Sequence, residues 1–342
     1  AEYFKKRGVP VFSLVHESAD FYDSAQLETI YSNSAAIIFP SRYTRERAEL
    51  KAPLGNTLAF IRGQGLLDPA FGTLGREPAR ADVLKQLQLP ENARLVLGCG
   101  TADIRKGVDL FVETAIKVLT GPLADEPPPI FVWLGGGMTS QGPDAWARRR
   151  VAESDLETCI IFAGEKADPE PFYRASDILL MTSRMDPFPC VIHEAMASAL
   201  PIIAFEGCSG APEAFLDSGL VVPAGDTTAM AYALSGLLAN EGERLRLAER
   251  AKSIVAEKWV FADYVEDVAA IISDLSDVAF DDRGSKPAPA VVADPAPRRG
   301  PIYFSSPDWG ISGVNTFTYN LVKGLNERGY DARILFTNGR HG

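Results

Sequence analysis

Residues 176–205, SDILLMTSRMDPFPCVIHEAMASALPIIAF, decide the fold class. They contain two short apolar runs, 177–182 and 201–205, and the segment between them is predicted to become a helix from about Pro189 onward. Proline is favoured in the first helical turn, because the N–H group that it lacks would have no partner there. Apolar runs that alternate with helices are typical of a parallel sheet covered on both faces. The stretch therefore predicts an α/β protein.

The same alternation extends over residues 94–275, with further candidate strands at 94–99, 130–134, 159–163 and 219–222. After Gly107, apolar residues recur with a period of 3.6 and predict an amphipathic helix. They are Val108, Phe111, Val112, Ala115, Ile116 and Leu119. Ligands of such sheets bind beyond the carboxyl ends of the strands, so we expect the functional residues in the loops that follow the strands.

The composition is that of a globular protein with an acidic balance. The 342 residues leave room for about two domains. Lys and Arg number 34 against 45 Asp and Glu, and the net charge of −11 argues against a surface that binds nucleic acid, which needs a basic face. No apolar run approaches the roughly 18 residues that would span a bilayer. The four cysteines lack metal-type spacing and indicate reduced thiols in a cytosolic protein.

The two ends of the sequence predict an interrupted domain organisation. Residues 9–17, VPVFSLVHE, indicate a buried strand with a charged tail, as if the chain began inside a domain. Residues 281–300 are rich in Pro and Ala and indicate a solvated linker. From Pro301 a new strand, helix and strand are expected, which suggests the start of a second domain and a fragment of a longer chain. The alternative is that this segment folds back and supplies the first βαβ unit of the domain at the start of the chain.

The loop from Gly98 to Gly107, GCGTADIRKG, is the first candidate site. Arg105 and Lys106 lie at the positive end of the expected helix, a combination that suits a diphosphate. A dinucleotide fingerprint fails, because its third glycine would fall on Asp103, and no phosphate-binding G-x-x-x-x-G-K-[ST] motif occurs. A plain turn with two solvated basic residues is the alternative.

The loop and helix around Pro189 are the most informative candidate. Asp186 and Glu194 are eight residues apart and could each accept hydrogen bonds from pairs of sugar hydroxyls. The backbone N–H groups of Cys190, Val191 and Ile192 would be free to hold an anion at the helix terminus. Acidic residues near a helix N-terminus are also favoured by the dipole alone, which is the alternative interpretation. The glycines at 135–137 leave room for a flat group, or form a flexible turn.

Together these loops resemble the donor-binding half of the retaining glycosyltransferases of family 4 (group 1), which depend on nucleotide sugars and have the GT-B fold. The resemblance is carried, in order, by VPVFSLVHE, RKGVDLFVETA, FYRASDILLMTSRMDPFPCVIHEAMASALPIIAF, APEAFLDSGLVVPAGD and EKWVFADYVEDV. Residues 301–336 resemble the opening β-loop-α-β of the same family's N-terminal domain, and their place after the linker suggests a tandem glycosyltransferase.

The resemblance implies two Rossmann-like domains, of which the N-terminal one is incomplete. The implied division is residues 1–75 for the late part of the N-terminal, acceptor-side domain, 76–260 for the nucleotide-sugar-binding domain, 261–279 for a closing helix that crosses back, 280–300 for the linker and 301–342 for the start of a second N-terminal domain.

The resemblance also implies roles for individual residues. Lys106 would hold the diphosphate, Glu194 the ribose hydroxyls and Asp186 the transferred sugar, while His16 would meet a sugar hydroxyl from the facing domain. His16, Asp186 and Lys106 are thus the expected catalytic residues. Further donor contacts are expected at Gly100, Thr101, Arg105, Gly135, Gly164, Phe188, Pro189, Cys190 and Val191.

Four features depart from the family pattern. Thr101 stands where the family has an arginine five residues before the lysine, and Asp186 replaces the first glutamate of its carboxylate pair. Pro187 and Pro189 replace both glycines of the family's loop, and the small glycine before the late proline is replaced around Ala199 in ASALP. These departures bear on the identity of the donor more than on the fold.

The implied function is transfer of a sugar from a UDP- or GDP-type donor to a saccharide or lipid-linked acceptor, with retention of configuration. No D-x-D sequence occurs, so a metal-independent reaction without a cofactor is expected. The implied location is the cytoplasm or the inner face of the membrane, with a peripheral membrane contact. The alternatives are a GT-B epimerase, a sugar phosphorylase, or a non-catalytic module that binds a sugar nucleotide or acts as a scaffold. For a phosphorylase, the sequence does not identify the lysine that would hold its cofactor.

Overall fold

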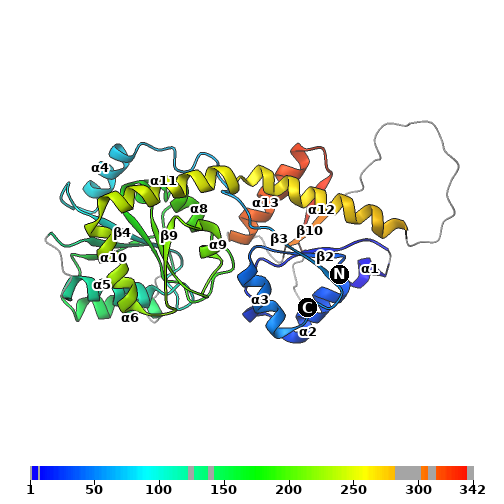
Figure 1. Cartoon of the computed structure of the whole chain (residues 1–342), viewed down its shortest axis with the longest axis horizontal. Coiled ribbons are helices and arrows are strands. Elements are labelled where there is room, and N and C mark those ends of the chain that lie inside the picture. Colours follow the sequence, from blue (N-terminus) through cyan, green and yellow to red (C-terminus); the bar gives the residue numbers. More distant parts are fainter. Residues whose placement is uncertain are drawn as a thin grey trace.

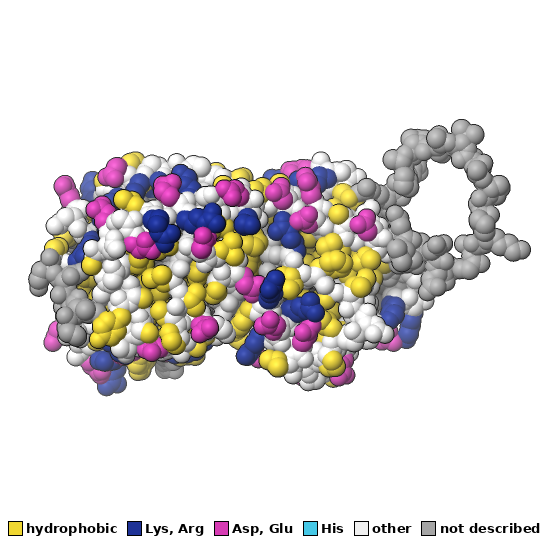
Figure 2. All heavy atoms as spheres, viewed as in Figure 1, with side chains coloured by type: hydrophobic (Ala, Val, Ile, Leu, Met, Phe, Trp, Pro, Cys, Tyr) yellow, Lys and Arg dark blue, Asp and Glu magenta, His cyan; other side chains and the backbone are white. Residues whose placement is uncertain are grey.

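The computed structural model describes residues 2–6, 8–121, 127–137, 142–281, 302–306 and 313–336. Two lobes lie side by side along the long axis, and a long pair of helices runs along their upper edge (Figure 1). Acidic and basic side chains are interspersed over both lobes on the face in view (Figure 2). The linker predicted at 280–300 lies, from residue 282 onward, outside the described residues.

The larger lobe contains a six-stranded, fully parallel sheet in the order β6-β5-β4-β7-β8-β9. The strands agree with the predicted ranges to within one residue at each end. They are β4 (Leu95–Cys99), β5 (Ile130–Leu134), β6 (Ile160–Gly164), β7 (Ile178–Met181), β8 (Ile202–Phe205) and β9 (Gly219–Val222).

Alternate residues of these strands enter two separate cores, which is why the runs are apolar on both faces. In β4, Leu95 and Leu97 face one core, and Val96 faces the other. The first core is covered by α4 (Arg76–Gln86), α7 (Glu170–Ala175), α8 (Cys190–Ala197), α9 (Ala211–Phe215) and α11 (Glu241–Lys258). The second is covered by α5 (Val108–Thr120), α6 (Pro143–Ala152) and α10 (Thr227–Ala239).

The strand order has a switch point between β4 and β7. The chain moves outward from β4 to β5 and β6, then returns to add β7 on the other side of β4. The loops that leave the carboxyl ends of β4 and β7 lie at this switch point, and open α/β sheets bind their ligands in the crevice at such a point.

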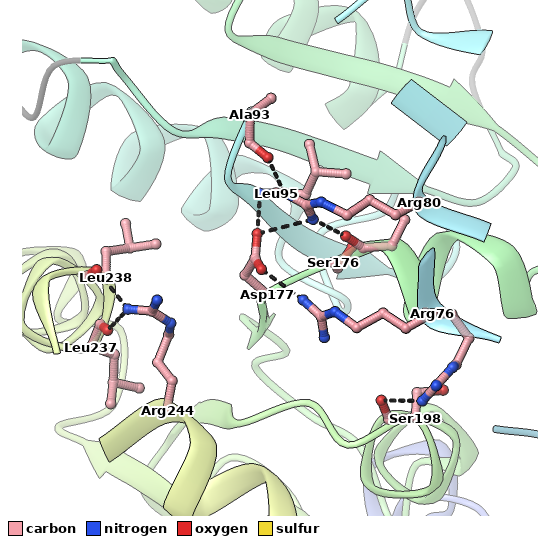
Figure 3. A network of polar contacts seen from close by, with 12 residues as sticks. Arg76, Arg80, Ala93, Leu95, Ser176, Asp177, Ser198, Leu237, Leu238 and Arg244 are labelled. Carbon is pink, nitrogen blue, oxygen red and sulfur yellow. Dashed lines mark hydrogen bonds and ion pairs between the residues drawn. The ribbon is translucent and has the colours of Figure 1, made fainter. Parts of the chain in front are cut away.

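The opposite, amino-terminal edge of the same two strands is held by charged groups. Asp177 accepts a hydrogen bond from the backbone N–H of Leu95, and Arg76 and Arg80 of α4 both pair with its carboxylate (Figure 3). Arg80 also donates to the backbone carbonyl of Ala93. This network fixes α4 against the sheet at the end remote from the predicted site.

The smaller lobe has a parallel sheet of three strands in the order β1-β2-β3, which confirms the strand predicted within 9–17. Its elements are α1 (Glu2–Lys5), β1 (Phe12–Leu14), the 3-10 turn η1 (Ala19–Phe21), α2 (Ser24–Asn33), β2 (Ala36–Phe39), α3 (Arg42–Lys51) and β3 (Leu58–Ile61). Helix α12 (Phe261–Asp281) leaves the larger lobe and packs on the smaller one. In the part of the chain that the structure describes, no helix has both the length and the apolar character needed to cross a bilayer.

The C-terminal segment packs on α12. It consists of β10 (Ile302–Ser306), α13 (Gly313–Glu327) and β11 (Ala332–Phe336), and its two strands pair in parallel. Phe317 of α13 is buried with Tyr264 of α12 and Ile38 of β2, and Arg328 pairs with Glu266 at 3.1 Å. The segment therefore packs on the smaller lobe, but β10 and β11 form a two-stranded sheet of their own and do not pair with β1-β2-β3. The fold-back alternative and the independent second domain both stay predictions.

Candidate functional site

Two loops at the switch point, 100–107 after β4 and 182–189 after β7, are bonded to each other. The backbone N–H of Arg184 donates to the carbonyl of Arg105 at 2.8 Å, and the Thr182 hydroxyl donates to the carbonyl of Lys106 at 3.3 Å. Gly107 has a φ of +73°, and a Cβ there would lie 2.0 Å from the carbonyl oxygen of Thr182. Only glycine permits this approach. The two loops thus meet as one rim of the crevice.

The contact between the loops brings Lys106 and Asp186 together. Lys106 Nζ and Asp186 Oδ2 form an ion pair, and their side chains are only 15% and 7% exposed. The Asp186 backbone is fixed on both sides, since its N–H donates to the carbonyl of Cys208 and its carbonyl accepts from the N–H of Gly210, each at 3.1 Å. The backbone N–H of Lys106 donates to the Asp103 carboxylate at 2.7 Å. Both partners of the ion pair are therefore held by their backbones as well as by each other.

Glu194, on α8, lies close to the same lysine. Burial raises the pKa of the Glu194 carboxyl, whereas the Tyr173 hydroxyl and the Lys106 ammonium act to lower this pKa. Tyr173 is fully buried and makes no hydrogen bond of ordinary geometry through its hydroxyl. A small hollow beside Lys106 is lined by Cys99, Lys106, Trp133, Leu179, Leu180, Met181, Thr182, Ser183 and Val191. The structure thus pairs Lys106 with Asp186 and brings it within electrostatic reach of Glu194.

The N-terminus of α8 corrects one prediction. Pro189 is the N-cap, but the N–H of Ile192 donates to the carbonyl of Pro189 at 3.2 Å and is not free for an anion. Burial raises the pKa of the Cys190 thiol, which lies at the start of this helix, to about 11, and the carboxylates of Glu194 and Asp186 act in the same direction. The thiol is therefore not an anionic group in the site.

Phe188 lies differently from what a donor contact requires. Its side chain is buried at 5% exposure and its ring packs against those of His193 and Trp259. Its backbone carbonyl accepts a hydrogen bond from Gln64 of the smaller lobe at 2.8 Å. The ring has almost no free surface for a ligand, because it belongs to the first core of the larger lobe.

Gly100, Gly135 and Gly164 link the ends of three neighbouring strands. The N–H of Gly100 donates to the carbonyl of Leu134 at 2.9 Å, and the N–H of Gly135 donates to the carbonyl of Gly164 at 3.0 Å. Gly135 has a φ of +151°, and a Cβ there would lie 2.0 Å from the Gly100 carbonyl oxygen. The close approach of the Gly100 backbone therefore explains why position 135 requires glycine, and no ligand is needed to explain it. Thr101 is exposed beside these turns.

His16 follows β1 in the smaller lobe. Its ring stacks on Phe317 with centroids 4.5 Å apart, and its Nε2 lies 3.5 Å from the hydroxyl of Tyr264. Burial lowers the pKa of His16 to about 4, so the imidazole is neutral near pH 7. The contacts that the structure gives His16 are with α12 and α13, and none of them is with Lys106 or Asp186.

Glu17, the residue after His16, lies within electrostatic reach of the predicted site, and it is not among the residues predicted from the sequence. Burial raises the pKa of the Glu17 carboxyl, the positive charge of Arg105 lowers this pKa, and the Asp186 carboxylate raises it. These effects place Glu17 within electrostatic reach of the rim. The side chain of Arg105 also donates to the carbonyl of Met185 at 3.4 Å. The only local signal in the sequence was its place next to His16.

The smaller lobe contacts both the loop that carries Asp186 and helix α9. The hydroxyls of Ser41 and Thr44 donate to the carbonyl of Pro187 at 2.8 and 3.2 Å. Glu213 of α9 accepts hydrogen bonds from the backbone N–H groups of Arg42 and Tyr43, both at 2.8 Å, at the N-terminus of α3. The smaller lobe thus contacts the crevice from the opposite side.

Comparison with known proteins identifies the domain that contains this crevice. Residues 93–240 match the family model described as glycosyl transferases group 1. The chain is 29% identical over 170 residues to the lipopolysaccharide core biosynthesis glycosyltransferase LpsE of Rhizobium meliloti (strain 1021), across 48% of this chain and 45% of that protein. It is also 29% identical over 215 residues to the mannosyltransferase LpsB of the same organism, across 53% of this chain and 58% of that protein. The chain thus spans about half the length of the curated relatives that it matches.

Solved structures with the same fold cover more of the chain. HepE from Anabaena, crystallised with UDP and glucose, matches with a TM-score of 0.68 and 16% identity over 79% of this chain and 73% of that one. WaaG, a glycosyltransferase involved in lipopolysaccharide biosynthesis, matches with a TM-score of 0.60 and 15% identity over 80% of each chain. Residues 93–240 therefore form a group 1 glycosyltransferase domain, and the chain around them has the GT-B fold.

Proposed function

We propose that this protein transfers a sugar from a nucleotide sugar to a saccharide or lipid-linked acceptor, with retention of configuration. The observation that carries the proposal is the meeting of Lys106, Asp186 and Glu194 at the switch point of a group 1 glycosyltransferase domain. Lys106 would bind the diphosphate, Glu194 the ribose hydroxyls and Asp186 the transferred sugar. HepE was crystallised with UDP and with UDP-glucose, which supports a donor of the same class.

The proposed reaction needs no metal ion. As the bond between the anomeric carbon and the diphosphate oxygen breaks, negative charge develops on the leaving group. The Lys106 ammonium and the N-terminus of α8 would stabilise this charge. The acceptor hydroxyl attacks from the face that the diphosphate leaves, and a phosphate oxygen takes its proton. The neutral imidazole of His16 would act as a polar contact from the smaller lobe, reached by a shift of the lobes.

Lys106→Ala tests the diphosphate role. The variant should stay folded but lose transfer of sugar from nucleotide-sugar donors. Its melting temperature should fall, because the buried Asp186 carboxylate loses its cation. Lys117→Ala is the matched control, because Lys117 is an exposed lysine of α5 that bonds Thr228 remote from the crevice. Turnover by Lys106→Ala equal to that of the control would remove Lys106 from the mechanism.

The nature of the donor is tested separately. A thermal-shift screen of the chain against UDP- and GDP-sugars should show stabilisation by one class, because a ligand that binds only the folded state raises its melting temperature. We expect Asp186→Glu to change the preference among these sugars, since the carboxylate would move by one methylene group. Equal rates for every donor would argue against contact between Asp186 and the sugar.

A non-catalytic module that binds a sugar nucleotide is the second candidate. The exposed Thr101, in place of the arginine of the family pattern, is the feature that favours it. Binding of a nucleotide sugar without hydrolysis or transfer would support this candidate. For an enzyme, we further propose a place at the cytoplasmic face of the membrane, where lipid-linked acceptors are available.

A further inference from the structure

We propose that the Lys106–Asp186 ion pair is an internal substitute for the donor's diphosphate, and that donor binding exchanges one anionic partner of Lys106 for another. The inference rests on the proposed function and concerns how the same site distinguishes a nucleotide sugar from the nucleoside diphosphate that remains after transfer. It assigns Asp186 two partners in turn, Lys106 before binding and sugar hydroxyls after it.

Burial is the first reason. With side chains 15% and 7% exposed, the two charges are largely removed from water and depend on each other for compensation. Glu194 is a second carboxyl group near the same lysine. Glu17 is a third carboxyl group, close enough for the charge of Asp186 to raise its pKa. A phosphate that approaches Lys106 therefore meets a cation already neutralised by a neighbour, within a group of acidic side chains.

The fixed backbone is the second reason. The hydrogen bonds of Asp186 to Cys208 and Gly210 hold its main chain, so the carboxylate can move away from Lys106 only by rotating its short side chain. A diphosphate that takes Lys106 leaves this carboxylate in place, still buried and now without its cation. An unpaired buried carboxylate is costly unless new hydrogen bonds replace the lost ones.

The consequence is a preference for the intact donor. A nucleotide sugar brings the hydroxyl groups of its transferred sugar, which can donate to the released carboxylate. The sugar hydroxyls of a nucleoside diphosphate are only those of its ribose, which we propose Glu194 holds. The exchange is therefore favourable for the substrate and unfavourable for the product. Asp186 would weaken binding of the product and so assist its release.

The test measures binding of UDP and GDP to the full chain by calorimetry. Asp186→Asn removes the competing charge and should tighten binding of the preferred diphosphate by about tenfold or more, the ratio equivalent to about 1.4 kcal/mol. Asp186→Glu keeps a competing charge and should stay within about threefold of the unaltered chain, a change of well under 1 kcal/mol. Asp217→Asn is the control for net charge, because Asp217 pairs with Arg250 on the surface. It should bind like the unaltered chain.

Asp186→Asn should bind the diphosphate more tightly, show stronger product inhibition and turn over more slowly. The kinetics of sugar transfer would not change in this way if Asp186 had only a structural role. If this variant does not fold, Asp186→Ala replaces it. The ¹⁵N signal of the Lys106 ammonium in the unaltered chain provides an independent measurement, and it should shift when UDP or GDP is added.

The outcomes separate the two proposals. Suppose that Lys106→Ala abolishes diphosphate binding, whereas Asp186→Asn binds the diphosphate as well as the unaltered chain or more weakly. This result overturns the exchange and leaves the proposed function unaffected. A Lys106 ammonium signal that does not respond to a bound diphosphate also overturns the exchange. Failure of the unaltered chain and of every Asp186 variant to bind UDP, GDP or their sugars overturns the proposed function itself.

Discussion

Glu213 offers a direct way to loosen the contact between the lobes. Its carboxylate lies at the N-terminus of α3 in the other lobe and accepts hydrogen bonds from the N–H groups of Arg42 and Tyr43. In Glu213→Gln the amide oxygen can accept only one of these bonds, and its NH₂ group faces the second donor. A hydrogen bond to a charged group contributes about 1.5–3 kcal/mol. The interaction of the charge with the helix dipole adds about 0.3–1 kcal/mol.

We therefore expect the substitution to weaken protection of the two amides by about 2 kcal/mol, which corresponds to roughly 30-fold faster exchange. Hydrogen exchange of Arg42 and Tyr43, resolved by NMR, measures this directly. Asp226→Asn is a control for loss of charge at a helix N-terminus, because both N–H groups at the start of α10 donate to the same oxygen, Oδ1, at 3.0 and 2.9 Å, within one lobe. Asparagine keeps that oxygen, so exchange at α10 and at α3 should change little. Unaltered exchange of Arg42 and Tyr43 in Glu213→Gln would refute the interlobe contact.

Three further predictions test other parts of the structure. Burial lowers the pKa of His193 to about 3, so the free energy of unfolding should fall as the pH drops below about 6.5, where the unfolded histidine takes up a proton and the folded one does not. Between pH 7 and pH 5, the free energy of unfolding of His193→Phe, measured by urea titration, should fall by about 2 kcal/mol less than that of the unaltered chain. The same pH dependence of the free energy of unfolding in both proteins would contradict this. A Cβ built on Gly324 lies 3.6 Å from the Cβ of Val265. The double variant Val265→Cys, Gly324→Cys should therefore form an intrachain disulfide on oxidation. A C-terminal segment that folds independently would not form this crosslink. Asp177→Asn should lower the free energy of unfolding by about 3 kcal/mol in denaturant titrations, because it leaves Arg76 and Arg80 without their carboxylate at the remote edge of the sheet. Binding of the donor should be unchanged in this variant. Loss of donor binding would show that the network influences the crevice.

Local patterns were sufficient to predict the larger lobe. The six strands and the helices between them follow from apolar runs and from the period after Gly107, because burial on both faces of a parallel sheet leaves a continuous apolar signal. The loops that carry Lys106 and Asp186 could be placed for the same reason, since a loop lies where a strand ends.

The partners of these loops could not be predicted from local patterns. Pairing of β4 with β7 skips two strands, and the periodicity of a strand does not specify its neighbour. The ion pair across the switch point depends on this pairing. Phe188 shows the same difficulty, because its sequence context fits a ligand contact and a buried ring equally well, and only its packing on Trp259 separates them. Residues such as Gln64 and Glu213 act across lobes, and no local feature of the sequence marks them.

Two of the departures from the family pattern, Pro187 and Pro189, lie in the loop that the smaller lobe contacts. Pro187 and Pro189 have no N–H group, and the hydrogen bonds from the smaller lobe to this loop go to the carbonyls of Pro187 and Phe188. These bonds come from Ser41, Thr44 and Gln64.

The position of the neighbouring Asp186 therefore depends on the contact between the lobes as well as on its own lobe. If the lobes separate, the loop loses these three donors and the carboxylate is less firmly directed at Lys106. Weakening the Glu213 contact should consequently make the ion pair easier to exchange and tighten diphosphate binding in the same direction as Asp186→Asn, though by less. A Glu213→Gln variant with faster exchange at α3 but unchanged diphosphate affinity would show that the two contacts are independent.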